Sequence, residues 1–250
     1  MPQHGRVVIV TGGGSGIGRR YCAAFAQAGY RVVVADIRGS QEVASELAAD
    51  GHEALAVTAD VSSEASVAEL ADAAVAAYGG IDVLVNNAAY FSSIVKKPFE
   101  EITVEEWDRA FAVNVRGAWL CARAVSPVMR RRGWGRIINT SSMTFHGGGI
   151  EGFAHYVSTK AAIVGLTRSL AKELGAYGIV VNTISPDYVE HEGELFRRQP
   201  EMAGILAQQR PIRRPGTMDD LIGPVLFLAG DDVGFITGQD IWVNGGRIFG

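Results

Sequence analysis

The sequence predicts an α/β fold: a doubly wound, mostly parallel sheet of seven strands with helices on both faces. Three observations lead to this prediction. Strand-like and helix-like stretches alternate from one end of the 250-residue chain to the other, as they do in parallel sheets covered by helices. A glycine-rich turn follows the first strand directly. No linker, low-complexity tract or short repeat interrupts the alternation, so we expect a single domain over residues 1–250.

Each predicted strand is a short run rich in β-branched and apolar residues. The runs cover residues 6–10, 31–35, 53–58, 81–85, 136–140, 179–184 and 240–243. The carboxyl ends of parallel strands share one edge of the sheet, and ligands of such folds bind beyond that edge. Residues that follow the strands are therefore the first candidates for a functional site.

The predicted helices lie between the strands and are bounded by capping residues and glycines. They cover residues 16–28, 41–49, 63–78, 103–129, 153–174 and 221–229. Ser63 and Thr103 stand at helix starts, while Gly29 and Gly51 stand where helices end. The segment 186–215 is less regular and contains only helix-like pieces.

Composition limits the functional classes. Hydrophobic residues make up 48% of the chain and charged residues 20%, which suits a globular protein with a sizeable core. The net charge of −4 gives no electrostatic reason to expect a nucleic-acid partner. No long apolar run predicts a membrane span or a signal peptide. We therefore expect a cytoplasmic enzyme or binding protein, in which Cys22 and Cys121 are small core residues rather than a disulfide.

The turn after the first strand has the sequence Thr-Gly-Gly-Gly-Ser-Gly-Ile-Gly, residues 11–18. Glycines there let backbone N–H groups approach a pyrophosphate that faces the N-terminus of the next helix. A tight turn without a ligand is the alternative. The strand before the turn and the helix after it favour a Rossmann-type dinucleotide site. Its expected contacts are Gly12, Ser15, Gly16, Ile17 and Gly18.

Asp36 ends the second predicted strand. A carboxylate at this place can accept hydrogen bonds from both ribose hydroxyls of an adenosine, and it repels a 2′-phosphate. Arg38 could instead bind such a phosphate, and an Asp that only caps the next turn is a further alternative. Because the glycine turn contains no basic residue, we predict NAD rather than NADP as the cofactor.

Polar residues also follow the third, fourth and fifth predicted strands. Asp60-Val61 and Asn87-Ala88 could hold the adenine side of a cofactor or brace its loops, with ordinary turn chemistry as the alternative. Ser142 lies at the same rim and could hydrogen-bond a substrate carbonyl.

Tyr156 and Lys160 are spaced so that their side chains leave the same face of a predicted helix. An ammonium beside a phenol favours the phenolate and lowers a pKa that starts near ~10. Such a tyrosine can exchange a proton with a substrate oxygen near neutral pH. Asn114, on another predicted helix, could hold a water that links Lys160 to solvent. The alternatives are a solvated Tyr–Lys pair and an exposed asparagine.

Together these motifs resemble the short-chain dehydrogenase/reductase family, of the short, single-domain kind. The resemblance spans nearly the whole chain and is carried by residues 11–18, 60–61, 86–89, 114, 141–142, 156–160 and 236–246. Residues 133–142 and 155–162 are also similar to bacterial reductases of aryl-alkyl ketones, which include 1-phenylethanol dehydrogenase.

The resemblance implies a role for each residue of the catalytic group. Ser142 would polarise the substrate oxygen, and Tyr156 would be the general acid/base. Lys160 would lower the pKa of Tyr156 and bind the nicotinamide ribose, and Asn114 would hold the relay water. The resemblance also implies a homotetramer. It adds Ala88, Pro186 and Val189 to the cofactor contacts.

Four departures from the family pattern surround the substrate end. Ala89 stands where the family usually has Gly. Asp187 replaces the Gly of the usual Pro-Gly and is expected to bring a carboxylate near the nicotinamide. His191 stands where a Thr often holds the carboxamide. The stretch from Ser142 to Tyr156 is one residue longer than the commonest spacing. These changes leave the substrate open but not the reaction class.

The substrate pocket is expected from residues 90–97, 143–155 and 187–210. They carry side chains that suit an aromatic or cyclic alcohol, with loop packing as the alternative: Tyr90, Phe91, Met143, Phe145, Phe153, Tyr188 and Phe196. Their histidines, His146, His155 and His191, show no recurring ligand spacing, so no metal is predicted. We expect the arginines of this region on a solvated face, with a carboxylate clamp as the alternative: Arg197, Arg198, Arg210, Arg213 and Arg214.

The sequence therefore predicts an NAD(H)-dependent oxidoreductase that interconverts a secondary alcohol and a ketone by hydride transfer. A NAD(H)-binding sensor or scaffold without turnover is the alternative from another class, and NAD-dependent epimerisation or dehydration is a third. Substrate identity, stereochemistry and direction are left open.

Overall fold

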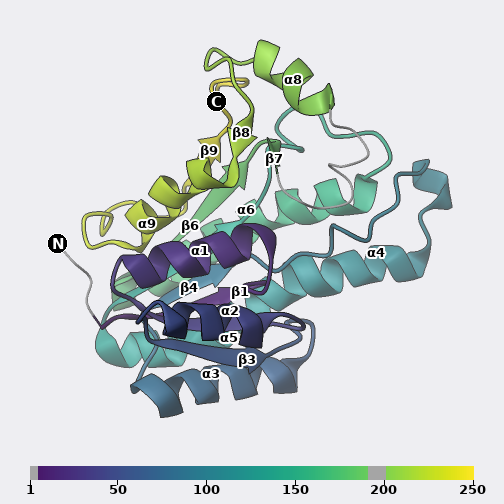
Figure 1. Ribbon diagram of the computed structural model, residues 1–250. Helices are drawn as coiled ribbons and strands as arrows, with labels where there is room; N and C mark the ends of the chain where they lie inside the picture. Colours follow the sequence, from purple (N-terminus) through teal and green to yellow (C-terminus); the bar gives the residue numbers. More distant parts are fainter. Residues whose placement is uncertain (1–4, 191–200) are drawn as a thin grey trace.

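The structure is a computed structural model that describes residues 5–190 and 201–250. Seven parallel strands form one sheet in the order β3-β2-β1-β4-β5-β6-β9 (Figure 1). Their bounds are β1 Val7–Thr11, β2 Arg31–Asp36, β3 Ala54–Thr58, β4 Val83–Asn86, β5 Gly135–Thr140, β6 Ile179–Pro186 and β9 Asp240–Val243. The predicted fold class is confirmed, and each predicted strand overlaps an observed one.

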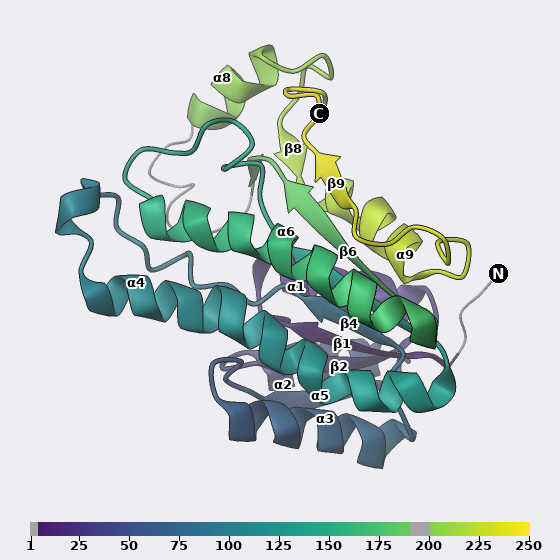
Figure 2. The ribbon, with the colours of Figure 1, turned by 180° about the vertical axis from the view of Figure 1, so that it is seen from behind.

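Helices cover both faces of this sheet. One face carries α1 Gly16–Gln27, α2 Ser40–Ala49 and α9 Ile222–Ala229, which lie in front in Figure 1. The other carries α3 Glu64–Tyr78, α5 Gly117–Arg132 and α6 Ala154–Leu174, which lie in front in Figure 2.

The two helical layers explain why β1 is apolar on both of its faces. Alternate residues of a strand point to opposite faces. Val7 and Ile9 of β1 join the core under α3 and α5, while Val8 and Val10 join the core under α1 and α9. All four residues are at most 1% exposed. A strand buried on both sides has no polar face, so it shows no alternation.

The predicted helix 103–129 is three consecutive segments in the structure. These are α4 Val104–Phe111, a five-residue π-helix η2 Ala112–Arg116, and α5. The chain continues as helix past Pro127 to Arg132. Proline removes one backbone hydrogen bond, but Val125 and Met129 on either side of it are at most 2% exposed, so core packing holds this helix.

The segment that was predicted as irregular contains short elements. β7 Val189–Glu190 pairs with β8 Gly216–Thr217 in a parallel ribbon, and α8 Glu201–Gln208 lies between them in the chain. Three short 3₁₀ turns complete the described structure: η1 Phe99–Glu101, η3 Gly175–Tyr177 and η4 Met218–Leu221. Within residues 5–190 and 201–250, no helix has both the length and the apolar character needed to cross a membrane.

The strand order reverses between β1 and β4. Loops that leave the carboxyl ends of these two strands diverge to opposite faces, and such a switch point is where ligands bind in open α/β sheets. The glycine turn follows β1 and the Asn87 segment follows β4, so both predicted cofactor segments lie at the switch point.

Candidate active site

The glycine turn brings β1 and α1 closer than other residues allow. A Cβ at Gly18 would collide with the carbonyl oxygen of Gly12. Gly12 itself has φ +65°, and a Cβ there would lie 2.8 Å from the Ala88 Cα. The turn is therefore specified by sterics within the protein, independently of any ligand.

Thr11 and Asn87 brace this turn from opposite sides. Thr11 Oγ1 accepts hydrogen bonds from the backbone N–H groups of Asn87 and Ala88, each at 3.1 Å. The Asn87 amide donates to the carbonyl oxygens of Thr11 and Gly12 at 3.1 and 3.3 Å. Asn87 thus braces the loops, as the sequence had suggested. Thr11 was missed as a site residue, although its place directly before the glycines was visible.

Asp36 and Asp60 both make turn contacts. The Asp36 carboxylate accepts from the Gly14 and Arg38 N–H groups at 2.9 and 3.1 Å, so it ties the end of β2 to the glycine turn. Asp60 accepts from both the hydroxyl and the backbone N–H of Ser62, and hydrogen bonding to the Ser62 hydroxyl is the main reason why its pKa is lowered. Turn capping is therefore part of the role of each carboxylate.

Three apolar residues among the predicted cofactor contacts have side chains in the core. Ile17 and Val189 pack against the core under α1 and α9. Val61 belongs to the other core, and a Cβ at Gly117 would lie 2.8 Å from its Cγ2.

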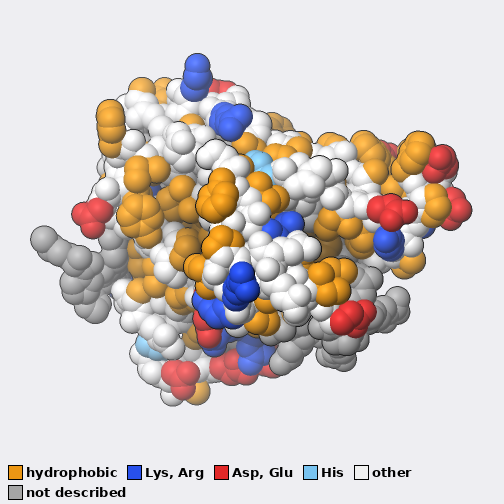
Figure 3. Space-filling view, turned by 90° about the horizontal axis from the view of Figure 1, so that it is seen from above, with side chains coloured by type: hydrophobic (Ala, Val, Ile, Leu, Met, Phe, Trp, Pro, Cys, Tyr) orange, Lys and Arg blue, Asp and Glu red, His pale blue; other side chains and the backbone are white. Residues whose placement is uncertain are grey.

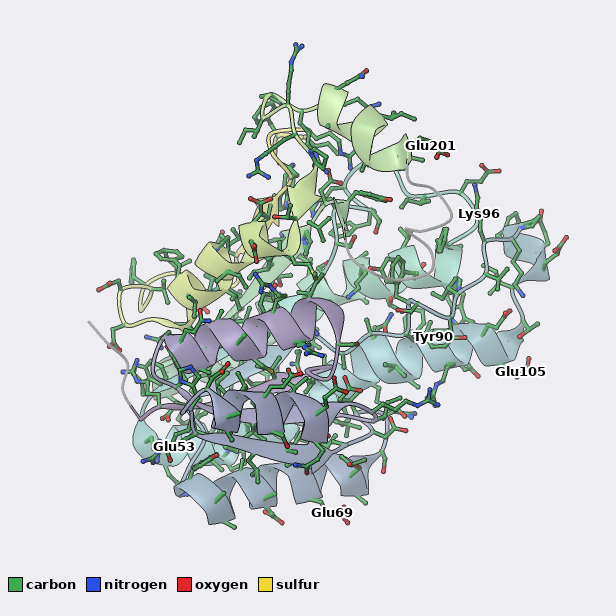
Figure 4. The ribbon with its side chains drawn as sticks, in the orientation of Figure 1. Glu53, Glu69, Tyr90, Lys96, Glu105 and Glu201 are labelled. Carbon is green, nitrogen blue, oxygen red and sulfur yellow. The ribbon has the colours of Figure 1, made fainter. Side chains whose placement is uncertain are left out.

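Asn114 lies within the π-helix and is 3% exposed, so the reading of it as an exposed polar residue is wrong. Its Oδ1 accepts from the Tyr90 N–H at 2.7 Å, and its Nδ2 donates to Thr159 Oγ1 at 3.0 Å. The Thr159 hydroxyl in turn donates to the Tyr156 carbonyl oxygen at 2.7 Å. Asn114 therefore links two parts of the chain: the segment of Tyr90, which is labelled in Figure 4, and the helix that carries Tyr156.

Ser142 and Tyr156 come together at the carboxyl edge of the sheet. Both residues are 8% exposed. Burial raises the pKa of Tyr156 to about 12, and a hydrogen bond with the Ser142 side chain acts in the opposite direction. A buried tyrosine and a serine that share a hydrogen bond can both reach one substrate oxygen.

Lys160 lies near Tyr156. The resemblance implies that Lys160 lowers the pKa of Tyr156, whereas in the structure burial has the larger effect and that pKa lies above its ordinary value. The Lys160 Nζ donates to the Thr140 carbonyl oxygen at 2.7 Å and lies 5.6 Å from the centre of the Tyr156 ring. Burial lowers the pKa of Lys160 itself to about 8.

Aromatic side chains line one side of Tyr156. Phe91 packs on the Tyr156 ring with centroids 4.6 Å apart, and on Phe153 at 6.3 Å. Ile94 completes this small cluster. Other predicted pocket residues are packing residues: Met143 is 1% exposed, and Phe145 stacks on His146 at 3.8 Å. Of the predicted pocket residues, Phe91 and Phe153 therefore lie beside Tyr156.

Asp187, one of the departures from the family pattern, forms ion pairs with Arg210 and Arg247. Arg210 is only 4% exposed. The prediction that Arg210 lies on a solvated face is wrong, because Asp187 provides a buried partner. Arg214 pairs with Asp220 on the exposed surface, and Arg213 is exposed as predicted. The remaining predictions, on His191, Phe196, Arg197 and Arg198, lie outside the described residues.

The histidines make individual contacts. His146 Nε2 shares a hydrogen bond with Asp240 Oδ2 at 2.8 Å. His155 is 2% exposed, and burial is the main reason why its pKa is lowered. Across residues 5–190 and 201–250, no three His, Cys, Asp or Glu side chains gather as a metal would require.

The residues at the switch point fit a dinucleotide. Ser15 precedes α1 without a side-chain hydrogen bond to the helix, and the first turn of α1 contains no acidic side chain. Its N–H groups are therefore available to an anion, which the helix dipole favours. A Cβ at Gly16 would meet no heavy atom within 4 Å, so the turn is open there.

The chain is similar to known proteins over nearly its whole length. Residues 12–247 match the family model for enoyl-(acyl carrier protein) reductase. The chain is 38% identical to the (2S)-[(R)-hydroxy(phenyl)methyl]succinyl-CoA dehydrogenase subunit BbsD of Thauera aromatica, over 99% of this chain and 98% of that one. It is 36% identical to the 3-oxoacyl-[acyl-carrier-protein] reductase FabG of Staphylococcus epidermidis, over 95% and 97%.

A solved structure from Beutenbergia cavernae superposes with a TM-score of 0.90 at 37% identity, covering 99% of both chains. That protein is proposed to be an NAD(P)-dependent gluconate 5-dehydrogenase and holds NADP at low occupancy. The family model and these relatives each cover nearly the whole chain. The chain therefore belongs to the short-chain dehydrogenase/reductase family, whose members are oxidoreductases that use a nicotinamide cofactor and act on CH–OH groups.

Proposed function

We propose that the protein is an NAD(H)-dependent oxidoreductase that interconverts a secondary alcohol and a ketone. The observation that carries this proposal is the buried Ser142–Tyr156 pair, with Lys160 one helical turn away. These groups can hold one substrate oxygen and move one proton, which is the chemistry that an alcohol–ketone exchange requires.

Each side chain has a proposed role. Ser142 and Tyr156 hydrogen-bond the substrate oxygen, and Tyr156 takes the hydroxyl proton during oxidation or returns it during reduction. Lys160 and a water held by Asn114 relay protons between Tyr156 and solvent. When bound, the nicotinamide supplies the hydride acceptor or donor. The Gly12–Gly18 turn and the N-terminus of α1 would hold the pyrophosphate of the dinucleotide.

The cofactor is proposed to be NAD. The Asp36 carboxylate is fixed beside the glycine turn by the Gly14 and Arg38 N–H groups, where it repels a 2′-phosphate. Two observations favour NADP instead of NAD: the presence of Arg38 and the NADP bound by the Beutenbergia relative. We expect Asp36→Ala to narrow the preference for NAD, measured as kcat/KM with each cofactor. An unchanged preference contradicts the assignment of Asp36.

The substrate is proposed to carry an aromatic or cyclic group next to its hydroxyl carbon. Support comes from Phe91 and Phe153 beside Tyr156, and the name of the Thauera relative includes a phenyl group on a hydroxylated carbon. The names of other relatives indicate acyl-carrier-protein-bound 3-oxoacyl groups and gluconate as substrates, so an open panel is needed.

The test is NADH or NADPH formation over a panel of aryl alcohols, cyclic polyols and hydroxy acids, with Tyr156→Phe as the control. Turnover that is lost in the control supports the proposal. If NADH binds but no member of the panel reacts, the sensor or scaffold alternative gains support. If NADH does not bind, the departures from the family pattern at Asp187 and Ala89 are the first changes to test as the cause of a defective cofactor site.

We also propose a homotetramer. A hollow of about 750 Å³ lies along α4, η2 and α5, and Phe111, Trp119 and Leu166 are among its lining residues. Trp107 and Trp119 are each 40% exposed. The lining also includes charged side chains, those of Glu105, Asp108, Arg109 and Arg116. Exposed aromatic side chains together with arginines are typical of an interface between subunits.

A further inference from the structure

Three charged side chains from distant parts of the chain meet beside the end of β6. The Asp187 carboxylate accepts hydrogen bonds from Arg247 Nε and Nη2 at 2.8 and 2.7 Å, and from Arg210 Nη2 at 2.9 Å. The side chains of Asp187, Arg210 and Arg247 are 6%, 4% and 21% exposed. The bidentate contact with Arg247 is of the strong, charge-assisted type.

This ion triad, Asp187 with Arg210 and Arg247, is unlike a surface pair. Burial opposes ionisation of Asp187, but the hydrogen bonds from Arg247 and Arg210 hold the pKa of Asp187 below its ordinary value. Arg210 also donates to the Tyr188 carbonyl oxygen at 2.9 Å. Removal of one arginine would leave a buried carboxylate with fewer partners, which is far more costly than loss of an exposed pair.

The triad fixes the C-terminal tail, residues 244–250, against the end of β6. The Asn244 side chain shapes the tail into a tight turn: it accepts from the Gly246 N–H at 2.8 Å and donates to the Ile248 carbonyl oxygen at 2.7 Å. The Ile212 N–H donates to the Gly245 carbonyl oxygen at 3.2 Å. The turn therefore carries Arg247 to Asp187. Figure 3 views the molecule from the side of α8 and the C-terminus.

The tail in turn lies against the loop that follows Ser142. A Cβ at Gly147 would lie 3.2 Å from Ile248 Cδ1 and 4.0 Å from Arg247 Nη1. The same loop is held at Met143, whose N–H donates to the Pro186 carbonyl oxygen at 2.9 Å. The residue that supplies this carbonyl directly precedes Asp187. Loop, strand end and tail therefore form one continuous set of contacts.

The loop sets the position of the Ser142 hydroxyl. Thr144 N–H donates to Ser142 Oγ at 3.3 Å, so the path of the chain after Ser142 affects the oxygen that is proposed to hold the substrate. Its glycines at 147–149 supply little stiffness of their own. Two backbone hydrogen bonds lie within the loop, from the Gly147 N–H to the Met143 carbonyl oxygen and from the Gly149 N–H to the Thr144 carbonyl oxygen. Contacts from outside, of His146 with Asp240 and of Gly147 with the tail, add to them.

We propose that Asp187, Arg210 and Arg247 are positioning residues that fasten the C-terminal tail onto the loop after Ser142. They act through this loop, and they keep Ser142 where the substrate oxygen binds. The proposal rests on the oxidoreductase function proposed above. It also gives a purpose to a carboxylate at a position where the resemblance leads one to expect glycine.

The kinetic test uses Arg247→Met, Asp187→Asn and the double variant, with Arg214→Met as the matched control. Arg214 also makes a two-point contact with a carboxylate, but its side chain is 54% exposed. In the two single variants we expect KM for the alcohol to rise on the order of tenfold. In Arg247→Met, whose side chain is not among the cofactor contacts, the NADH dissociation constant should stay at the wild-type value. The double variant should lose no more than the worse single variant, because the residues act as a unit. Arg247→Lys should reverse only part of the rise in KM that Arg247→Met causes, because lysine restores the positive charge but not the two-point hydrogen bond of the guanidinium group.

A second readout needs no substrate. Hydrogen–deuterium exchange of residues 141–149 should be faster in Arg247→Met and Asp187→Asn than in the wild type, and unchanged in Arg214→Met. If the wild type turns over no alcohol, the proposed function fails and the exchange readout alone decides whether the triad positions the loop. If Asp187→Asn does not fold, Arg247→Met decides, since Arg247 lies on the tail. Wild-type exchange in Arg247→Met overturns the proposal, and so do wild-type KM and kcat in an active enzyme or additive losses in the double variant.

Discussion

Burial pushes the pKa values of Tyr156 and Lys160 in opposite directions, each towards the neutral form of its side chain. The pKa of Tyr156 rises to about 12 and that of Lys160 falls to about 8. A neutral tyrosine is ready to donate a proton to a ketone oxygen, whereas it must first lose its proton to act as a base on an alcohol.

The direction of these shifts predicts the pH dependence of the reaction. The deprotonated fraction of Tyr156 increases as pH rises towards its pKa of about 12, so kcat/KM for alcohol oxidation should rise between about pH 7 and 10. Tyr156 stays almost fully protonated over the same range, so kcat/KM for ketone reduction should change little. The check is a pair of pH–rate profiles with the same substrate couple. Profiles that are flat in both directions contradict a rate-limiting proton transfer at Tyr156.

Loss of the Tyr156 hydroxyl should remove the proton transfer without disturbing the aromatic cluster. We expect Tyr156→Phe to lower kcat by about 10²–10⁴-fold, the usual contribution of general acid–base catalysis. NADH binding, measured by fluorescence titration, should persist. Phe153→Leu, a change in the neighbouring ring, is the control and should affect KM more than kcat.

The lowered pKa of Lys160 predicts that the stability of the protein depends on pH. Its folded-state pKa of about 8 lies below the ordinary 10.5, so the unfolded chain binds more protons between these values. The free energy of unfolding should therefore rise with pH across this window, by about 1.4 kcal/mol for each unit by which the two pKa values differ. The raised pKa of Tyr156 acts in the opposite sense, but only above its ordinary value of 10.

The variant Lys160→Met isolates this effect. It should be more stable than the wild type in urea denaturation near pH 7 and should lack the rise in stability towards about pH 9.5. Equal pH dependence in the two proteins would mean that Lys160 titrates normally.

At the scale of elements, a buried chain of polar side chains joins the strands to α6. Asn86 of β4 donates to Asn139 of β5 at 2.9 Å, and Asn139 donates to Thr167 of α6 at 2.8 Å. Thr183 of β6 donates to the same hydroxyl at 2.7 Å. Asn139, Thr167 and Thr183 are fully buried, so this chain fixes the height of α6, and with it Tyr156, above the sheet.

Thr167→Val should remove the hydroxyl group from this polar chain while it keeps the shape of the side chain. It leaves the Asn139 amide and the Thr183 hydroxyl without their partner, at a cost of about 1–3 kcal/mol in the free energy of unfolding. Thr58→Val at the exposed end of β3 is the control and should change stability little. A Thr167→Val protein as stable as this control contradicts the structural importance of the chain.

The same scale shows what the sequence could predict. The strands and the glycine turn were predicted because their signals are local: short apolar runs, and glycines placed between a strand and a helix. The π-helix around Asn114 has no local pattern, and the contacts of Asn114 with Tyr90 and Thr159 join residues 24 and 45 positions apart in the chain. Arg210 was misjudged for a similar reason, since its partner Asp187 lies 23 positions away in the chain. The Thr140 carbonyl that holds Lys160 is likewise a tertiary contact.

For the whole molecule, the face along α4 and α5 is the proposed subunit interface. Trp119→Glu replaces an exposed aromatic side chain of the hollow with a carboxylate, and we expect it to reduce the mass of the assembly in light scattering. Tyr177→Glu is the control, because Tyr177 is similarly exposed, at 44%, but lies outside the hollow. A wild-type protein that is already monomeric, or a Trp119→Glu protein with the wild-type mass, contradicts this interface.

The position of Arg247 has a consequence for biosynthesis. A chain leaves the ribosome from its N-terminus, so the glycine turn and the first strands emerge long before the tail. In the described part of the chain, strand β9 pairs with β6 alone at the edge of the sheet, and Arg247, one of the two arginine partners of Asp187, follows β9. A nascent chain can therefore complete its cofactor-binding half while the loop after Ser142 still lacks the support of the tail. Loss of the last few codons through a premature stop should accordingly yield a protein that still binds dinucleotide but turns over its alcohol poorly.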